Sequence, residues 1–137
     1  FYKTGQRRDL NREKFEYEKL SITLNNFDSY ANKNLNFLKK AMDIRSNLEC
    51  FNPNSAMKCL SNGRTDIVVF RRGIGNQSMW VIHNITDNKL NYSVEDGDMN
   101  YLLRNVFNLK DYLTGNKYNI RNIQLDPFQV IWLGFDR

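Results

Sequence analysis

Three arginines and one carboxylate stand close together in the stretch TGQRRDLNREKF, residues 4–15. Arg7, Arg8, Asp9 and Arg12 lie where a loop enters a helical pattern. Guanidinium groups and backbone N–H groups at such a point can gather around a phosphate, a nucleic acid or the oxygens of a sugar. The same side chains can also be solvated, with Asp9 as the N-cap of a helix. Taken by itself, the stretch fits both interpretations.

Beyond that stretch, few side chains form a pattern typical of catalysis. His83 is the only histidine and lies in an apolar run, where a single imidazole is more often a core or edge residue than a metal ligand. Cys50 and Cys59 match neither a zinc site nor a disulfide framework, so we expect reduced thiols. The sequence therefore predicts no metal site and no cofactor.

The charged residues of the second half fit structural roles. Arg71 and Arg72 end an apolar run and are expected to face solvent, while Asp96 and Asp98 flank Gly97 and are typical of a turn. A glycosidase that works alone needs two carboxylates beside the scissile bond. No acidic residue here has neighbours that suggest a nucleophile or a raised pKa, so we expect no catalytic residue in this chain.

The charge pattern argues against nucleic-acid and membrane partners. The net charge is +5, but acidic residues alternate with basic ones, as in NREKFEYEKL, and leave no basic stripe. No apolar run reaches the roughly 20 residues that cross a bilayer, and the first residues do not resemble a signal peptide. We expect a cytoplasmic protein and, because residue 1 is not Met, a segment of a longer chain.

The elements that position these residues change type part-way along the chain. Apolar residues at spacings of three and four predict helices between residues 11 and 48, the second capped by Asp28 or Ser29. Short runs of β-branched and aromatic residues, separated by turn signals, follow. They predict strands at 66–72, 79–85, 89–95, 100–107, 118–125 and 128–135. The fold class is α+β, with N-terminal helices over 1–55 and a small antiparallel β-sandwich domain over 60–137.

The order of the motifs resembles one known family. GQRRDLNREKF precedes helices that end in AMDIRSNLECFNPNS, and DIVVFRR, MWVIHNITD, DYLTG and FQVIWL follow. This ordered set resembles the C-terminal end of the sucrose-phosphorylase-like enzymes of glycoside hydrolase family 13. The resemblance covers nearly the whole chain and includes an R-x-x-x-x-x-F pattern at Arg45 and Phe51, although Glu13 stands where histidine is usual.

The resemblance implies both a fold and a function. Residues 1–55 would be the end of a (β/α)8 barrel, and 60–137 a C-terminal all-β domain. Arg12 would help to hold the glucosyl unit, and Asp9 and Arg8 would shape the loop at the mouth of the barrel. The parent enzyme would convert sucrose and phosphate into glucose 1-phosphate and fructose by a retaining mechanism, with its catalytic carboxylates outside this chain.

Other interpretations stay open at this point. The chain can be a stand-alone β-sandwich module that binds carbohydrate or a protein partner, or the tail of a related amylosucrase or glucosidase. An apolar stripe of Leu35, Leu38 and Met42 on the second predicted helix also suggests that a fragment of this kind associates with itself.

Overall fold

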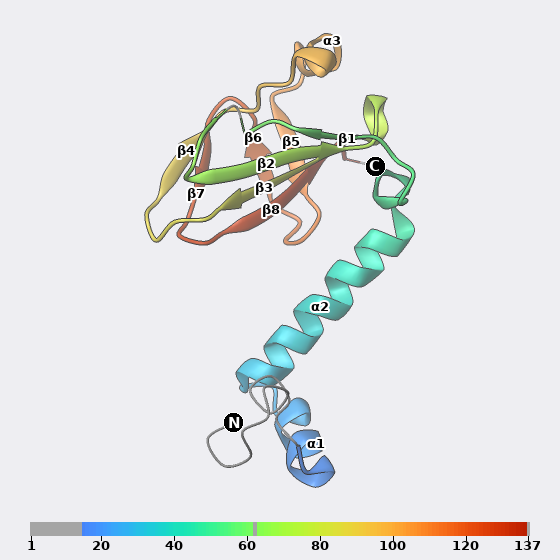
Figure 1. The fold of residues 1–137 in the computed structure, drawn as a ribbon, viewed down its shortest axis with the longest axis vertical. Helices are drawn as coiled ribbons and strands as arrows, with labels where there is room; N and C mark the ends of the chain where they lie inside the picture. Colours follow the sequence, from blue (N-terminus) through green and yellow to red (C-terminus); the bar gives the residue numbers. More distant parts are fainter. Residues whose placement is uncertain (1–14, 62, 137) are drawn as a thin grey trace, which may run out of the picture. The chain divides into compact units, whose positions relative to one another are not determined.

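A computed structural model describes residues 15–61 and 63–136 of the chain (Figure 1). The chain divides into two compact units, residues 1–40 and 41–137. In the described ranges the structure is α+β, with a few helices and an antiparallel β-domain, as the sequence predicts at this level. None of the described helices is long and apolar enough to span a membrane.

The two longer helices are α1 (Tyr17–Asn25) and α2 (Tyr30–Asn47). Of the two caps that the sequence predicts for α2, Asp28 and Ser29, the structure shows Ser29. Its Oγ accepts a hydrogen bond from the backbone N–H of Asn32 at 3.0 Å. The same hydroxyl donates to the carbonyl oxygen of Thr23 at 2.6 Å. One serine therefore closes the turn between the helices and starts α2.

Polar contacts, more than apolar burial, join α1 to the start of α2. Asn32 is the only buried residue of α2, and α1 has none. The Nδ2 of Asn32 donates to the carbonyl oxygen of Leu24 at 2.5 Å, and its Oδ1 accepts from the Nδ2 of Asn36 at 2.8 Å. Of the predicted apolar stripe, Leu38 and Met42 are more than half exposed. Self-association through this stripe stays a prediction.

The second unit holds all the described strands and four short helices. The strands are β1 (Met57–Cys59), β2 (Ile67–Arg72), β3 (Met79–Asn84), β4 (Leu90–Tyr92), β5 (Asn108–Asp111), β6 (Lys117–Asn119), β7 (Ile123–Leu125) and β8 (Val130–Gly134). The short helices are η2 (Glu49–Phe51), η3 (Gly75–Gln77), η4 (Gly97–Met99) and α3 (Asn100–Leu103). Six strands form one antiparallel sheet in the order β1-β2-β3-β8-β5-β6, and β4 pairs with β7.

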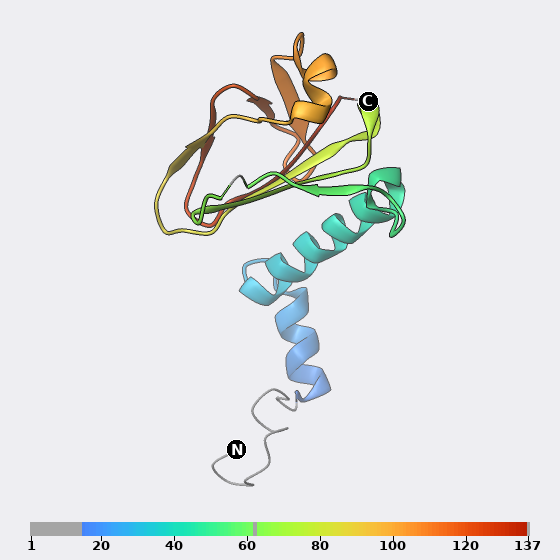
Figure 2. The same cartoon turned by 45° about the horizontal axis from the view of Figure 1, so that its top comes forward.

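The β-domain closes on one main core. β3 is buried along most of its length because β2 and β8 flank it on both sides (Figure 1). Trp80, Ile82, Ile131 and Leu133 are fully buried there, and residues of β4, β7 and α3 complete the cluster. Figure 2 shows the β4–β7 pair across the domain from β2 and β3. The antiparallel domain that the sequence predicts thus has a packed interior.

Some predicted strands differ from the structure. The sequence predicts a strand at 100–107, but this run begins with the short helix α3, because its adjacent apolar residues fit either period. The run at 118–125 splits into β6 and β7 around a turn, in which Asn119 Oδ1 accepts from the N–H of Arg121 at 2.9 Å. The predicted strands include neither β1 nor β5, and both are short.

Candidate functional site

The residues predicted to bind substrate, Arg8, Asp9 and Arg12, lie outside the described residues, as does nearly all of the stretch that contains them. α1 begins at Tyr17 and has no side-chain hydrogen bond at its N-cap. Asp9 is therefore not the cap of this helix, and that interpretation does not apply to α1. The substrate-binding role stays a prediction.

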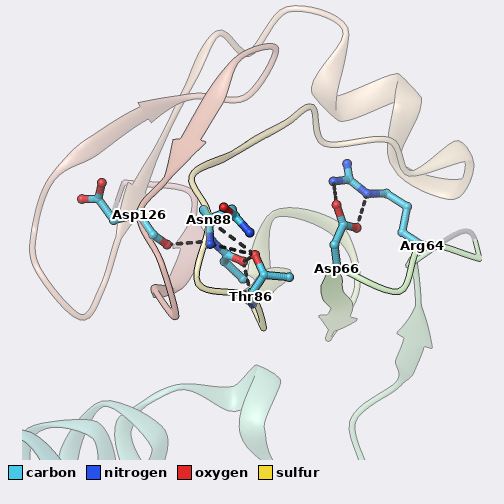
Figure 3. A network of polar contacts seen from close by, with 6 residues as sticks. Arg64, Asp66, Thr86, Asn88 and Asp126 are labelled. Carbon is cyan, nitrogen blue, oxygen red and sulfur yellow. Dashed lines mark hydrogen bonds and ion pairs between the residues drawn. The ribbon is translucent and has the colours of Figure 1, made fainter.

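The HNITD motif builds a hydrogen-bonded turn at the end of β3. Asn84 is only 2% exposed, and its Nδ2 donates to the carbonyl oxygens of Asn88 at 2.7 Å and Asp126 at 2.8 Å. Its Oδ1 accepts from both the N–H (3.0 Å) and the hydroxyl (2.8 Å) of Thr86. Figure 3 shows Thr86, Asn88 and Asp126 in this network. Because all four positions of the amide are used, Asn84 has a structural role.

The DYLTG motif builds a second such turn at the end of β5. Asp111 is fully buried, and its Oδ1 accepts from the backbone N–H groups of Trp132 at 2.8 Å and Leu113 at 3.1 Å. Its Oδ2 accepts from the hydroxyl of Thr114 at 2.6 Å. A carboxylate that accepts three hydrogen bonds in the interior fixes the backbone around it. Asp111 thereby ties the DYLTG turn to the FQVIWL strand.

Arg45 and Phe51, the two residues of the R-x-x-x-x-x-F pattern, line one hollow of about 400 Å³ at the end of α2. The ring of Phe51 also packs on Trp132, with ring centroids 4.9 Å apart. The end of the pattern therefore lies where η2, the short helix after α2, packs on β8.

A buried ion-pair cluster corrects the prediction for Arg71. Its side chain is 7% exposed instead of facing solvent, and Nη1 lies 3.4 Å from Oδ2 of the fully buried Asp96. Nη2 lies 3.5 Å from Oδ2 of Asp98, which also accepts from Lys58 Nζ at 2.6 Å. The indole Nε1 of Trp80 donates to Asp96 Oδ2 at 3.2 Å. Asp96 is therefore more than the turn residue that its place beside a glycine suggests.

A periodic signal for this cluster is present in the sequence. Ile67, Val69 and Arg71 alternate along β2, and all three face the buried side. Extending the period-two pattern by one step places Arg71 inside. We predicted burial only for the apolar residues of this run, because an arginine is rarely buried without a partner. The partner of Arg71 is Asp96, which follows 25 residues later along the chain.

Several carboxyl groups of the described ranges are held in the ionised form by neighbouring cations. Arg64 lowers the pKa of Asp66 through two hydrogen bonds, and Figure 3 shows this pair. Lys58 lowers the pKa of Asp98, and Lys117 and Lys110 lower that of Asp136. A general acid for glycoside cleavage needs the opposite shift.

Burial lowers the pKa of the half-buried His83, whose ring centroid lies 6.2 Å from that of Phe70. In the described part of the chain, no group of three or more His, Cys, Asp or Glu side chains is placed to hold a metal ion.

Comparison with known proteins gives no family assignment. No model of a known protein family matches the chain, and a search of curated protein sequences finds no significant match. Inferences about function therefore depend on the residues and on the geometry described above.

Proposed function

We propose that this chain is the C-terminal part of a sucrose-phosphorylase-like enzyme of glycoside hydrolase family 13. The N-terminal residues, about 1–55, would be the end of its (β/α)8 barrel, and 60–137 a β-sandwich scaffold domain. The parent enzyme would act in the cytoplasm on sucrose and phosphate, without a cofactor. A glucosyl group passes from sucrose to an enzyme carboxylate and then to phosphate, with retention of configuration.

One observation carries this proposal: the separate motifs behind the family resemblance meet in the folded domain. Asn84 of HNITD binds the carbonyl oxygen of Asp126, just before β8, and Asp111 of DYLTG binds the N–H of Trp132 within β8. β8 lies between β3 and β5 in the sheet. The arrangement of these motifs around one strand is the support for the proposal.

In the proposed enzyme, this chain positions substrate and does not break the bond. Arg12 holds the glucosyl unit through its guanidinium group, and Asp9 and Arg8 shape the loop around it. The carboxylates that act as nucleophile and acid–base lie on other parts of the barrel. The β-domain serves as a scaffold domain and supplies no reacting group.

Two measurements test the proposal. The isolated chain should release no glucose 1-phosphate from sucrose and phosphate, because it lacks the nucleophile. In the full-length enzyme, Arg12→Ala should lower the rate of phosphorolysis about 100-fold, since a misplaced substrate loses reactivity steeply. Arg7→Ala is the matched control and should stay within about twofold, as expected for a solvated side chain. Equal and mild effects of the two variants would refute the role of Arg12.

A second candidate is a stand-alone binding or interaction module, and the compactness of residues 41–137 favours it. This unit has its own buried core and complete sheet. Expression of residues 41–137 alone would separate the two candidates. Tight binding of a glycan or protein by this unit, together with a gene that encodes no barrel, would favour the module. A full-length enzyme that hydrolyses sucrose or extends a glucan, without phosphorolysis, would indicate the glucosidase or amylosucrase relative.

A further inference from the structure

The main sheet has two faces, and only one of them lies on the main core. Along β3, Trp80 and Ile82 belong to that core. The residues that alternate with them, such as Val81 and His83, therefore lie on the opposite side, which we call the outer face. Phe51 of η2 packs against the cluster that contains Val81 and covers that half of the outer face. The half around His83 is the more open one.

Five residues form the open half, which we call the outer patch: Val68, His83, Ile85, Phe128 and Val130. Val68 of β2 and Val130 of β8 are the register partners of His83 on its two sides (Figure 1). One further step of the alternation along β3 adds Ile85, and the N–H of Phe128 donates to the carbonyl oxygen of the next residue, Thr86, at 3.0 Å. Val68, Ile85 and Phe128 are 39%, 49% and 65% exposed. A contiguous apolar surface of this kind is typical of contact with another macromolecule.

Phe128 is held in a backbone conformation that does not suit its side chain. Its φ is +54°, the only positive φ of a non-glycine residue in the described ranges. It is the third residue of a turn over 126–129, in which the N–H of Gln129 donates to the carbonyl oxygen of Asp126 at 3.1 Å. Glycine or asparagine is usual at such a position, because a bulky side chain is strained there. Strain of this kind is concentrated at functional surfaces, and here it places an aromatic ring in solvent.

The outer patch is complementary to a second copy of itself. In its central row, a valine stands on each side of His83, one in β2 and one in β8. A two-fold axis along β3 would lay β2 of one copy over β8 of the other, so that Val68 meets Val130 twice. Two sheets that pack face to face bury their apolar rows between them in this way.

The charged residues at this end of the domain fit the same arrangement. Beside β2, Arg64 pairs with Asp66 at 2.6 Å, and beside β8, Lys89 pairs with Asp126 at 3.0 Å. The axis along β3 brings each pair over the other pair of the second copy, so that cations can meet carboxylates. Asp87, in the turn after β3, adds one more carboxylate. Two cations and three carboxylates leave almost no net charge, which gives a strongly charged partner little attraction.

We propose that the outer patch is a weak two-fold contact between copies of this chain. His83 and Ile85 lie near the axis, and Phe128 is the main apolar anchor over β2 of the other copy. Side chains of this number and exposure cover on the order of 400 Å² per copy, about half of a standard interface, so the expected Kd is about 0.1–1 mM. The surface is separate from the apolar stripe on α2, and the contact does not depend on the proposed activity.

The full 137-residue chain allows a direct test by sedimentation and by nuclear magnetic resonance. Between about 0.05 and 1 mM, the average mass should rise toward that of a dimer. Over the same range, the amide signals of residues 66–70, 83–86 and 128–130 should shift. Those of β6 (Lys117–Asn119), which is separated from β3 by two strands of the sheet, should stay in place.

Variants at one position separate the ring of Phe128 from its backbone. Phe128→Gly and Phe128→Ala both remove the ring and should weaken association about tenfold. In dilute solution, Phe128→Gly should unfold about 4 °C above Phe128→Ala, because only glycine relieves the left-handed backbone. Phe107→Ala removes a ring that is 69% exposed elsewhere in the domain, and it is the matched control. It should leave association unchanged within about twofold.

Two further variants locate the contact. Val68→Lys places a charge on the outer patch at an exposed position, so it should abolish association up to about 1 mM. Leu38→Ser changes the exposed stripe on α2 and should leave association intact. The spectra of dilute samples report whether each variant remains folded.

Three outcomes would overturn the proposal. One is a monomer throughout the concentration range, without shifts at the outer patch. Another is association that Leu38→Ser abolishes and Val68→Lys leaves intact, which would place the contact on α2. The third is association that the Phe128 variants weaken no more than Phe107→Ala does. Absence of phosphorolysis in the parent enzyme would contradict only the proposed activity.

Discussion

The guanidinium group of Arg71 and the carboxylate of Asp96 lie 3.4 Å apart, with 7% and 0% of their side chains exposed. A charge pair in the interior loses its hydration, so it contributes little net stability while both members are present. Removal of one member is different, because it leaves an uncompensated charge. The pair therefore makes the fold depend on both residues together.

Arg71→Met should lower the free energy of unfolding by about 3–5 kcal/mol, since the Asp96 carboxylate would stay buried without its cation. Asp96→Leu in the same background should restore much of that loss. Urea unfolding monitored by tryptophan fluorescence measures both. Lys89→Met is the matched control, because Lys89 forms an exposed pair with Asp126, and it should change stability by less than about 1 kcal/mol. A loss equal to that of Lys89→Met would contradict the buried pair.

Gly73→Ala tests a close backbone approach. Gly73 has φ of +78°, and a Cβ built there would lie 2.9 Å from Cys50 Cβ and 3.1 Å from the carbonyl oxygen of Gln77. Gly115→Ala is the matched control, since its φ is +87° and a Cβ there meets nothing within 4 Å. The control should lose about 1–2 kcal/mol from backbone strain alone. Gly73→Ala should lose about 1–3 kcal/mol more from overpacking, as measured by thermal unfolding. If Gly73→Ala and Gly115→Ala lose the same stability, the close contact with Cys50 can be relieved by a small shift and causes no overpacking.

His83 should titrate below the ordinary imidazole value of 6.5, because burial lowers its pKa. The unfolded chain then binds the proton more readily than the folded chain. Stability from this residue is fully present above pH 6.5 and falls as the pH drops toward the folded pKa. Since His83 is the only histidine, its ring protons give one resolved titration by nuclear magnetic resonance.

The control for the titration of His83 is the same chain in concentrated urea. There the midpoint of the histidine titration should lie at about 6.5. His83→Gln should remove the dependence of stability on pH that this group supplies below pH 6.5. A folded midpoint at or above 6.5 would contradict the effect of burial.

Apolar periodicity predicted the central parts of the fold and failed at its margins. β2, β3 and β8 follow from runs of β-branched and aromatic residues, which leave few alternatives in a buried sheet. α3 was missed because four residues show no clear period. β1 was missed because all three of its residues are exposed and carry no burial pattern.

The polar sites were harder to predict, for a physical reason. The partner of Arg71 is set by how the chain folds, and no local rule links two residues that stand 25 positions apart. The same holds for Asp111, which accepts a hydrogen bond from Trp132. In the sequence, Asp111 is only the first residue of the DYLTG motif, and Asp96 is only a residue beside a glycine. Their burial and pairing appear only when the strands are brought together.

The position of β8 between β3 and β5 has a consequence for synthesis on the ribosome. β8 alone links β1, β2 and β3 to β5 and β6 in the main sheet, yet it is the last of these strands to be made. Until residues 130–134 are available to pair, the edges of β3 and β5 that face β8 lack their partner in this sheet. Such edges are where strands of other molecules pair. The interval before the last strand emerges is therefore the time at which a nascent chain of this kind most needs a chaperone.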